Sequence, residues 1–334
     1  MTPHTLEIVE VRADDPAAVD AAFEIVEESV HADRPDLPPE CRYQYDMQWR
    51  VPPPRGPRHR FLARRDGEPV GAVQLDLPRH DNLDKAHVDV HVRPAHRRRG
   101  VGRALFAHAS AVARADGRTR VLGFGPAEPA GFAESCGLTN GLLDARRRLL
   151  LADADEAALD RLYAEGRAKA AGYRLVHWGD ALPEEYVEDI AALDSSFLTE
   201  TPMGELDVEP ERVDAERLRT QHAAFLAWGS RRYEAGLVHE ASGRLVAWTA
   251  IRVARTVDWH AWQLITLVHP AHRGRRLGLV AKIANLRAMR AAEPAVTTID
   301  TFNATDNPYM IAINEAMGFR LVDHWANWQG PIRD

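Results

Sequence analysis

The feature of this sequence that most constrains its fold is an internal repeat. Residues 67–72 (GEPVGA) read like residues 243–248 (GRLVAW), and residues 94–99 (PAHRRR) read like residues 270–275 (PAHRGR). Both matches are offset by 176 residues, and one constant shift across separate matches indicates duplicated structural units. In a chain of 334 residues, each copy has about the length of a typical domain, roughly 150 residues. The sequence therefore predicts an N-terminal domain over residues 1–150, a connector helix over 151–171 and a C-terminal domain over 172–334.

Within each copy the hydrophobic pattern alternates between strands and helices. The first copy contains Asp66-Gly67, a strong signal for a β-hairpin turn, followed by an expected strand at 87–92 and an expected helix at 101–114. The second copy repeats this order with a strand at 262–268 and a helix at 277–290. Such alternation predicts an α/β fold built on a mixed (α+β) sheet.

Composition limits the cellular context and the partners. The net charge of −7 does not favour non-specific binding to nucleic acid. The sequence contains no run of about 18 apolar residues, so no membrane span is predicted. The two cysteines provide no disulfide framework and fit a reducing compartment. We therefore expect a cytoplasmic protein with no nucleic-acid or membrane partner, acting as a monomer or a homodimer.

Each copy has a basic, glycine-containing turn between its central strand and the helix that follows. Such a turn directs several backbone N–H groups at one spot, and the helix dipole adds positive potential there. Glycine lets a phosphate approach the backbone closely, and arginine neutralises the remaining charge. The turn therefore indicates a pyrophosphate site. Its expected residues are Val92, Arg97, Arg98, Arg99, Gly100, Val101, Gly102 and Arg103 in the first copy, and Val268, Arg273, Gly274, Arg275, Arg276, Leu277 and Gly278 in the second.

The pattern Arg97-x-x-Gly100-x-Gly102, preceded by Val92-x-Pro94, resembles the acetyl-CoA signature of the GNAT superfamily of N-acetyltransferases. The resemblance covers nearly the whole chain and implies two tandem GNAT folds, with acetyl-CoA as co-substrate and no metal. It further implies acetyl transfer to the primary amine of a small molecule, by direct attack in a ternary complex.

The second copy departs from this pattern because Arg276 stands where the first glycine is expected. Its side chain either blocks the phosphate or points outward. The closing segment of this copy nevertheless matches the superfamily, which implies that Asn303 and Asn307 bond the pantetheine arm and that Asn314 lies at the acyl end. Many GNAT enzymes have a tyrosine that serves as the general acid four residues before the final glycine. Here that position holds Ala133 in the first copy and Asn314 in the second, and neither is a general acid.

A general base is expected because the attacking amine must lose a proton. In the first copy His87, Asp89 and His91 share one strand face, which leaves three interpretations open: Asp89 as the base, a metal site, or a solvated polar face. In the second copy an acidic loop at 200–209 suggests that Glu205 or Asp207 holds a cationic amine, unless the loop is simply solvated.

The candidate catalytic residues are therefore Asp89, Glu205 and Asn314. The interpretation favours catalysis in the second half, with the first half binding acetyl-CoA or serving as a structural partner. Two alternatives remain: acetylation of a protein or peptide amine, and a non-catalytic protein that binds or senses acyl-CoA.

Overall fold

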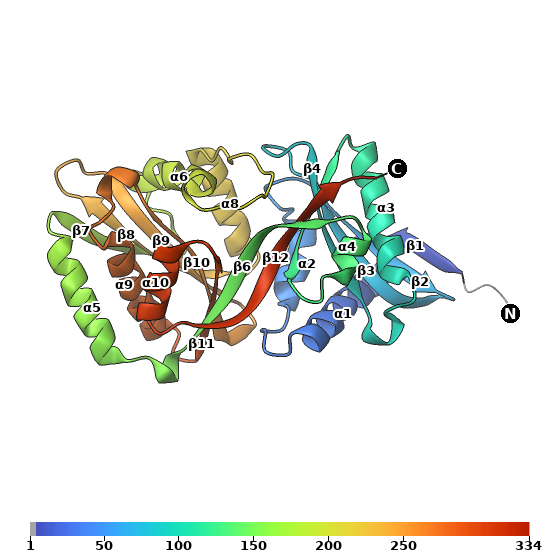
Figure 1. Ribbon diagram of the computed structural model, residues 1–334, viewed down its shortest axis with the longest axis horizontal. Helices are drawn as coiled ribbons and strands as arrows, with labels where there is room; N and C mark the ends of the chain where they lie inside the picture. Colours follow the sequence, from blue (N-terminus) through green and yellow to red (C-terminus); the bar gives the residue numbers. More distant parts are fainter. Residues whose placement is uncertain (1–4, 334) are drawn as a thin grey trace. The chain divides into compact units, whose positions relative to one another are not determined.

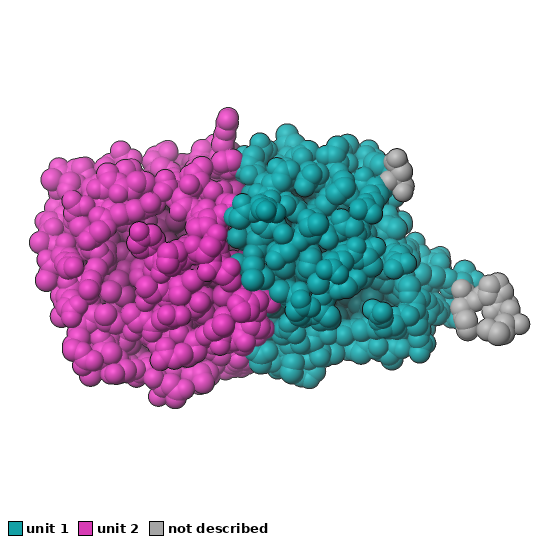
Figure 2. All heavy atoms as spheres, viewed as in Figure 1, with its two compact units in different colours: residues 1–143, 204–209, 325–334 teal, residues 144–203, 210–324 magenta. Residues whose placement is uncertain are grey.

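The computed structural model describes residues 5–333, which form two compact units (Figure 2). Unit 1 comprises the described residues up to 143 together with 204–209 and the segment from 325 onward, and unit 2 comprises 144–203 and 210–324. The predicted domain boundaries follow chain order, whereas these units are assembled from non-consecutive segments. Helix α5 (Glu156–Lys169) occupies most of the predicted connector and belongs to unit 2.

Unit 1 is a mixed sheet with helices on both faces. Its strands lie in the order β1-β2-β3-β4-β5-β12, and β4 and β5 are parallel while the other recorded pairs are antiparallel. The elements that form it are β1 (Leu6–Glu10), α1 (Pro16–Asp33), α2 (Arg42–Arg50), β2 (Arg58–Arg65), β3 (Glu68–Asp76), β4 (Lys85–Val92), η1 (Pro94–His96), α3 (Val101–Ala115), β5 (Arg120–Pro126), α4 (Gly131–Ser135), the first part of β6 (Thr139–Leu150) and the last part of β12 (Arg320–Pro331).

The alternation of side chains along the strands produces the two layers of unit 1. On one face Phe61 and Ala63 of β2 pack against Leu105 of α3, and on the other face Leu62 packs with Ile25 of α1, because neighbouring strand residues point to opposite faces. The hairpin predicted at Asp66-Gly67 is confirmed: both residues have positive φ, 52° and 86°.

Unit 2 repeats this plan. Its strands lie in the order β6-β11-β10-β9-β8-β7, with β10 and β11 parallel. Helix α9 covers one face and α6 and α8 cover the other (Figure 1). The elements that form it, besides α5 and the shared strands, are η2 (Leu151–Asp153), β7 (Tyr173–Trp178), η3 (Glu184–Tyr186), α6 (Val187–Ser195), α7 (Phe197–Glu200), α8 (Ala215–Ala227), β8 (Arg231–His239), β9 (Leu245–Ala254), β10 (Val257–Val268), η4 (Pro270–His272), α9 (Leu277–Ala292), β11 (Thr298–Ala304) and α10 (Pro308–Ala316).

The last strand of each repeat completes the sheet of the other unit. Residues 144–150 of β6, at the end of the first copy, pair with β11 in unit 2. Residues 325–331 of β12, at the end of the second copy, pair with β5 in unit 1. Each unit therefore needs residues from both halves of the sequence.

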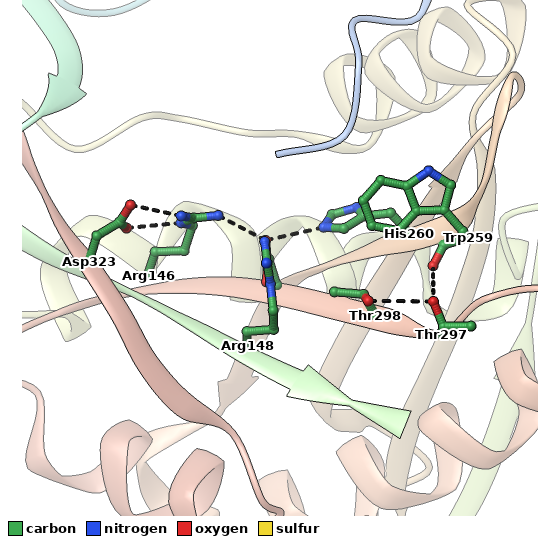
Figure 3. A network of polar contacts seen from close by, with 8 residues as sticks. Arg146, Arg148, Trp259, His260, Thr297, Thr298 and Asp323 are labelled. Carbon is green, nitrogen blue, oxygen red and sulfur yellow. Dashed lines mark hydrogen bonds and ion pairs between the residues drawn. The ribbon is translucent and has the colours of Figure 1, made fainter. Parts of the chain in front are cut away.

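A buried ion network holds β6 in unit 2 (Figure 3). Arg146, which is fully buried, donates to Asp323 of β12 (Nε–Oδ1 2.9 Å) and lies 3.3 Å from Asp300 of β11. Arg148 binds the same Asp300 through two bonds of 2.7 Å. Paired, hydrogen-bonded charges are the form in which charged groups are tolerated in a core.

No helix within residues 5–333 is both long enough and apolar enough to cross a membrane.

Candidate active site

The parallel strands of each unit separate toward their carboxyl ends. In unit 1 the pairing of β4 with β5 runs only from Lys85 to His87, while the pairing of β4 with β3 continues to Val92. In unit 2 the pairing of β10 with β11 runs from His260 to Trp262, although β9 follows β10 to its end. Ligands of open α/β sheets bind outside the carboxyl ends of such strands. Each split is therefore a candidate site.

The turn after each central strand has the same backbone conformation in both units. Arg98 (φ 61°) and Gly100 (φ 83°) are left-handed in unit 1, and the residues 176 positions later, Gly274 (φ 79°) and Arg276 (φ 56°), are left-handed in unit 2. Glycine and arginine have exchanged places between the two left-handed positions. The conformation costs a non-glycine residue about 1–2 kcal/mol, and each turn contains one arginine in this conformation.

The side chain of Arg276 points away from the turn. Its Nη1 binds Glu165 Oε2 of α5 at 2.6 Å. Of the two alternatives for this residue, the structure supports the outward one.

The first arginine of each turn braces the end of the central strand. Arg97 Nε donates to the Val92 carbonyl (3.1 Å), and its Nη1 binds Asp33 of α1 (2.6 Å). Arg273 makes the corresponding bonds in unit 2, to the Val268 carbonyl (3.2 Å) and to Glu200 (2.7 Å). Both guanidinium groups were expected to face a pyrophosphate, but they are bound to protein carboxylates instead.

Other residues of the turns remain available to an anion. Arg98, Arg99 and Arg103 are exposed in unit 1, as is Arg275 in unit 2. Val101 and Leu277 are buried core residues, so only their backbone belongs to the turn. Gly102 and Gly278 follow them, where an added Cβ would lie 3.0 Å from Phe132 and 3.4 Å from Thr266 respectively.

Asp89 lies on β4 just beyond its last pair with β5, and its side chain is 57% exposed. Its Oδ2 is 3.0 Å from His91 Nε2. Desolvation raises the pKa of Asp89, but His91 and Arg58 outweigh it and hold that pKa below its ordinary value. Against the opposing effect of burial, Asp89 raises the pKa of His91.

The described residues contain no cluster of three His, Cys, Asp or Glu side chains arranged to hold a metal ion. The metal interpretation of His87, Asp89 and His91 therefore has no structural support.

Asn314 lies in the interior of unit 2. It is fully buried, its Oδ1 accepts from Lys282 Nζ (2.7 Å) and its Nδ2 donates to Asn303 Oδ1. Burial lowers the pKa of Lys282 to about 7. Asn307 caps α10 by accepting from the Met310 amide (3.1 Å). The structure joins Asn303 and Asn314 but gives Asn307 a capping role.

Glu205, expected in a substrate loop of the second copy, belongs to unit 1. Its amide donates to the Gly141 carbonyl and its carbonyl accepts from Gln329 Nε2, both at 2.7 Å. Two residues further on, Asp207 pairs with Arg120 at 3.1 Å. This part of the acidic loop is held along the last strands of unit 1, so Glu205 and Asn314 do not share one unit.

Two further charged side chains are buried, Lys282 (1% exposed) and Arg60 (5% exposed), and neither is among the expected site residues. Lys282 is charged within an apolar helix (LVAKIA), and Arg60 opens an apolar strand run (RFLA). A charged residue at a position that faces the core could have identified both as candidate site residues, because lysine and arginine are rarely buried without a partner.

Comparisons with known proteins agree with this architecture. The model of the acetyltransferase (GNAT) family matches residues 20–137. Among solved structures, a tandem GNAT protein from the clavulanic acid biosynthesis pathway is 31% identical, with 99% of each chain covered and a TM-score of 0.82.

More distant structures share the fold alone. A GCN5-related N-acetyltransferase from Sphaerobacter thermophilus is 13% identical, with 98% of this chain and 96% of that chain covered and a TM-score of 0.64. The GCN5-related glucosamine N-acetyltransferase region of a fungal multi-domain GH3 β-N-acetylglucosaminidase is 15% identical, with 98% of this chain and 38% of that chain covered and a TM-score of 0.65. A search of curated proteins finds no match. The prediction of a mixed α/β protein with two tandem GNAT folds is confirmed, and the chain belongs to the GNAT acetyltransferase family.

Proposed function

We propose that the protein is an acetyl-CoA-dependent N-acetyltransferase that acts on the primary amine of a small molecule, with its chemistry in unit 1. The observation that carries this proposal is the position of the Asp89–His91 pair, directly beyond the point where β4 and β5 separate. Two ionisable side chains therefore lie beside the strand end that leads into the turn at Gly100, which supports a role for them as an acid–base pair.

The turn of unit 1 fits the pyrophosphate of acetyl-CoA. A Cβ added at Gly100 would meet no atom within 4 Å, so the backbone there is open to a ligand. The exposed side chains of Arg98, Arg99 and Arg103 supply positive charge at the start of α3. Acetyl-CoA bound there supplies the acetyl group as a thioester.

Asp89 and His91 have different roles toward the acceptor amine. The Asp89 carboxylate attracts the ammonium form of the amine, and neutral His91 accepts the proton that the amine must lose. The raised pKa of His91 makes its neutral form a stronger base than an ordinary histidine. Because the two groups are 3.0 Å apart, they titrate as a pair, and the rate should rise with pH as the pair loses its proton.

Unit 2 lacks this pair. The positions 176 residues after Asp89 and His91 are Ile265 and Leu267, and Asn314 is buried in a hydrogen-bond chain. These observations favour a second role for unit 2, as a structural or non-catalytic acyl-CoA-binding partner. We therefore propose that the catalytic centre lies in the first half of the chain, whereas the sequence alone favoured the second half.

The test is acetyl-CoA-dependent thiol release in the presence of primary amines. His91→Gln, which removes the proposed proton acceptor, should lower kcat/KM by about 10²–10⁴-fold, the usual contribution of general acid–base catalysis. Asp89→Asn should also lower kcat/KM, because it removes the carboxylate that attracts the ammonium and raises the pKa of His91. Glu7→Gln, which removes an exposed carboxylate on β1, is the matched control and should leave the rate unchanged. Full activity of Asp89→Asn, or the absence of amine-dependent thiol release for every amine tried, would overturn the proposal.

A further inference from the structure

A row of polar side chains crosses the sheet of unit 1 from β2 to β4. Arg60 is paired with Gln74, and Gln74 is paired with Asp89. Residues directly opposite each other in a sheet point to the same face, and in the next row Leu62 and Ala72 pack against α1. Arg60 therefore shares the α1 and α2 face with Asp89, two strand spacings or about 10 Å away along the sheet.

Arg60 is buried in an aromatic cage provided by α2. Its guanidinium lies 4.4 Å from the ring centre of Tyr45 and 4.8 Å from that of Trp49, and the residue is only 5% exposed. Its Nη2 donates to Gln48 Oε1 at 2.6 Å. Its Nε is buried and has no hydrogen-bond partner.

Among the described residues no carboxylate binds Arg60 directly, and Asp76 attracts its charge only from a distance. The neighbouring Arg58 binds Asp76 through two bonds, of 2.6 and 2.8 Å, and these account for both carboxylate oxygens. Within residues 5–333 no acidic side chain forms an ion pair with Arg60. Burial consequently lowers its pKa to about 10, and a buried guanidinium is ordinarily paired with an anion.

A carboxylate from a ligand would supply what Arg60 lacks. It would provide the missing negative charge and an acceptor for Nε, and a planar carboxylate matches the guanidinium fork. With the acceptor amine at Asp89, this carboxylate belongs several bonds away on the same molecule. We propose that the acceptor is an amino acid-like compound whose amine and carboxylate are separated by a chain, and that Arg60 is the residue that binds the carboxylate. This inference rests on the proposed function.

The test compares ω-amino acids with alkylamines of equal length: 4-aminobutyrate with butylamine, 5-aminopentanoate with pentylamine and 6-aminohexanoate with hexylamine. The wild-type protein should acetylate at least one acid with a kcat/KM about 10–100-fold above that of its alkylamine, as expected for a hydrogen bond to a charged group. Arg60→Met keeps an unbranched side chain beside the two rings and should abolish this preference, so that the ratio of the acid rate to the alkylamine rate, both measured on the variant, falls to about 1. Arg60→Lys, which keeps the charge but not the fork, should restore part of it, and Arg64→Met on the same strand is the control for charge removal.

Calorimetric titration with the same acids gives a readout that does not require catalysis. The wild-type protein should bind the preferred acid at least 10-fold more tightly than Arg60→Met does. If binding follows this pattern while no amine is acetylated, the carboxylate site stands and the proposed transferase function fails. Equal rates and equal affinities for acids and alkylamines in the wild-type protein would overturn the inference. A fall in kcat/KM in Arg60→Met that is the same for the ω-amino acids and for the alkylamines would also overturn it.

Discussion

Replacing Lys282 by methionine isolates the energetic effect of one buried charge. Lys282 lies on α9, is 1% exposed, and burial alone lowers its pKa from 10.5 to about 7. Its Nζ donates to Asn314 Oδ1 at 2.7 Å and lies 5.5 Å from the ring centre of Phe319. Methionine has a similar length and no charge, so it removes the titration while keeping most of the volume.

The sign of the effect follows from proton binding. Between pH 7 and 10.5 the unfolded chain holds the lysine proton and the folded protein has released it, so the stability of the wild-type protein rises with pH. One pKa unit corresponds to about 1.4 kcal/mol. The full shift therefore amounts to roughly 5 kcal/mol, of which about 3 kcal/mol is regained between pH 6 and pH 9.

Methionine also leaves Asn314 Oδ1 without its donor, which costs about 1–3 kcal/mol at every pH. Lys282→Met should therefore be about 3 kcal/mol more stable than wild type at pH 6, an advantage that disappears near pH 9. Urea unfolding of both proteins at pH 6, 7.5 and 9 measures this difference. A difference that stays constant with pH would refute the reasoning, because it would mean that Lys282 titrates normally in the folded protein.

Three further predictions concern other parts of the chain. Asp300→Asn should destabilise the protein by about 3–5 kcal/mol, because it leaves Arg146 and Arg148 short of their shared partner. Despite desolvation, Arg148 and His260 lower the pKa of Asp300 to about 2. The wild-type protein should therefore lose stability as the pH falls from 4 toward 2, and acid unfolding followed by circular dichroism should show a shallower loss in the variant. Glu205→Gln should leave acetyl transfer unchanged, since the bonds recorded for Glu205 are made by its backbone, and a large fall in kcat/KM would contradict this placement. Arg276→Gly should change the free energy of unfolding by less than about 1 kcal/mol, because relief of the left-handed conformation offsets the loss of an exposed ion pair; thermal unfolding would expose any larger effect.

The internal repeat made much of the fold predictable. An offset of 176 residues located both central strands, both turns and both following helices, because each is encoded by local periodicity and turn residues. The exchange of the last strands was not predictable in this way. The strands expected from the sequence include neither residues 144–150 nor residues 325–331, and local pattern does not say which neighbour a strand pairs with.

The candidate site was predictable only in part. The Asp89–His91 pair follows from the alternation of side chains along one strand, so the sequence could place both on one face. The bond from Arg97 to Asp33 joins residues 64 positions apart, and the placement of Glu205 depends on Gly141, also 64 positions away. Contacts of this range are set by the packed fold rather than by local sequence.

The most direct test of the central claim is a calorimetric titration with acetyl-CoA of the wild-type protein and of two matched variants, Arg99→Glu and Arg275→Glu. The two arginines occupy equivalent positions, 176 residues apart, and both are exposed. If unit 1 holds the working site, Arg99→Glu should weaken binding at least 10-fold, because it reverses a charge beside the phosphate turn, while Arg275→Glu should leave that site intact. Loss of binding in Arg275→Glu with normal binding in Arg99→Glu, or no binding by the wild-type protein, would contradict the account.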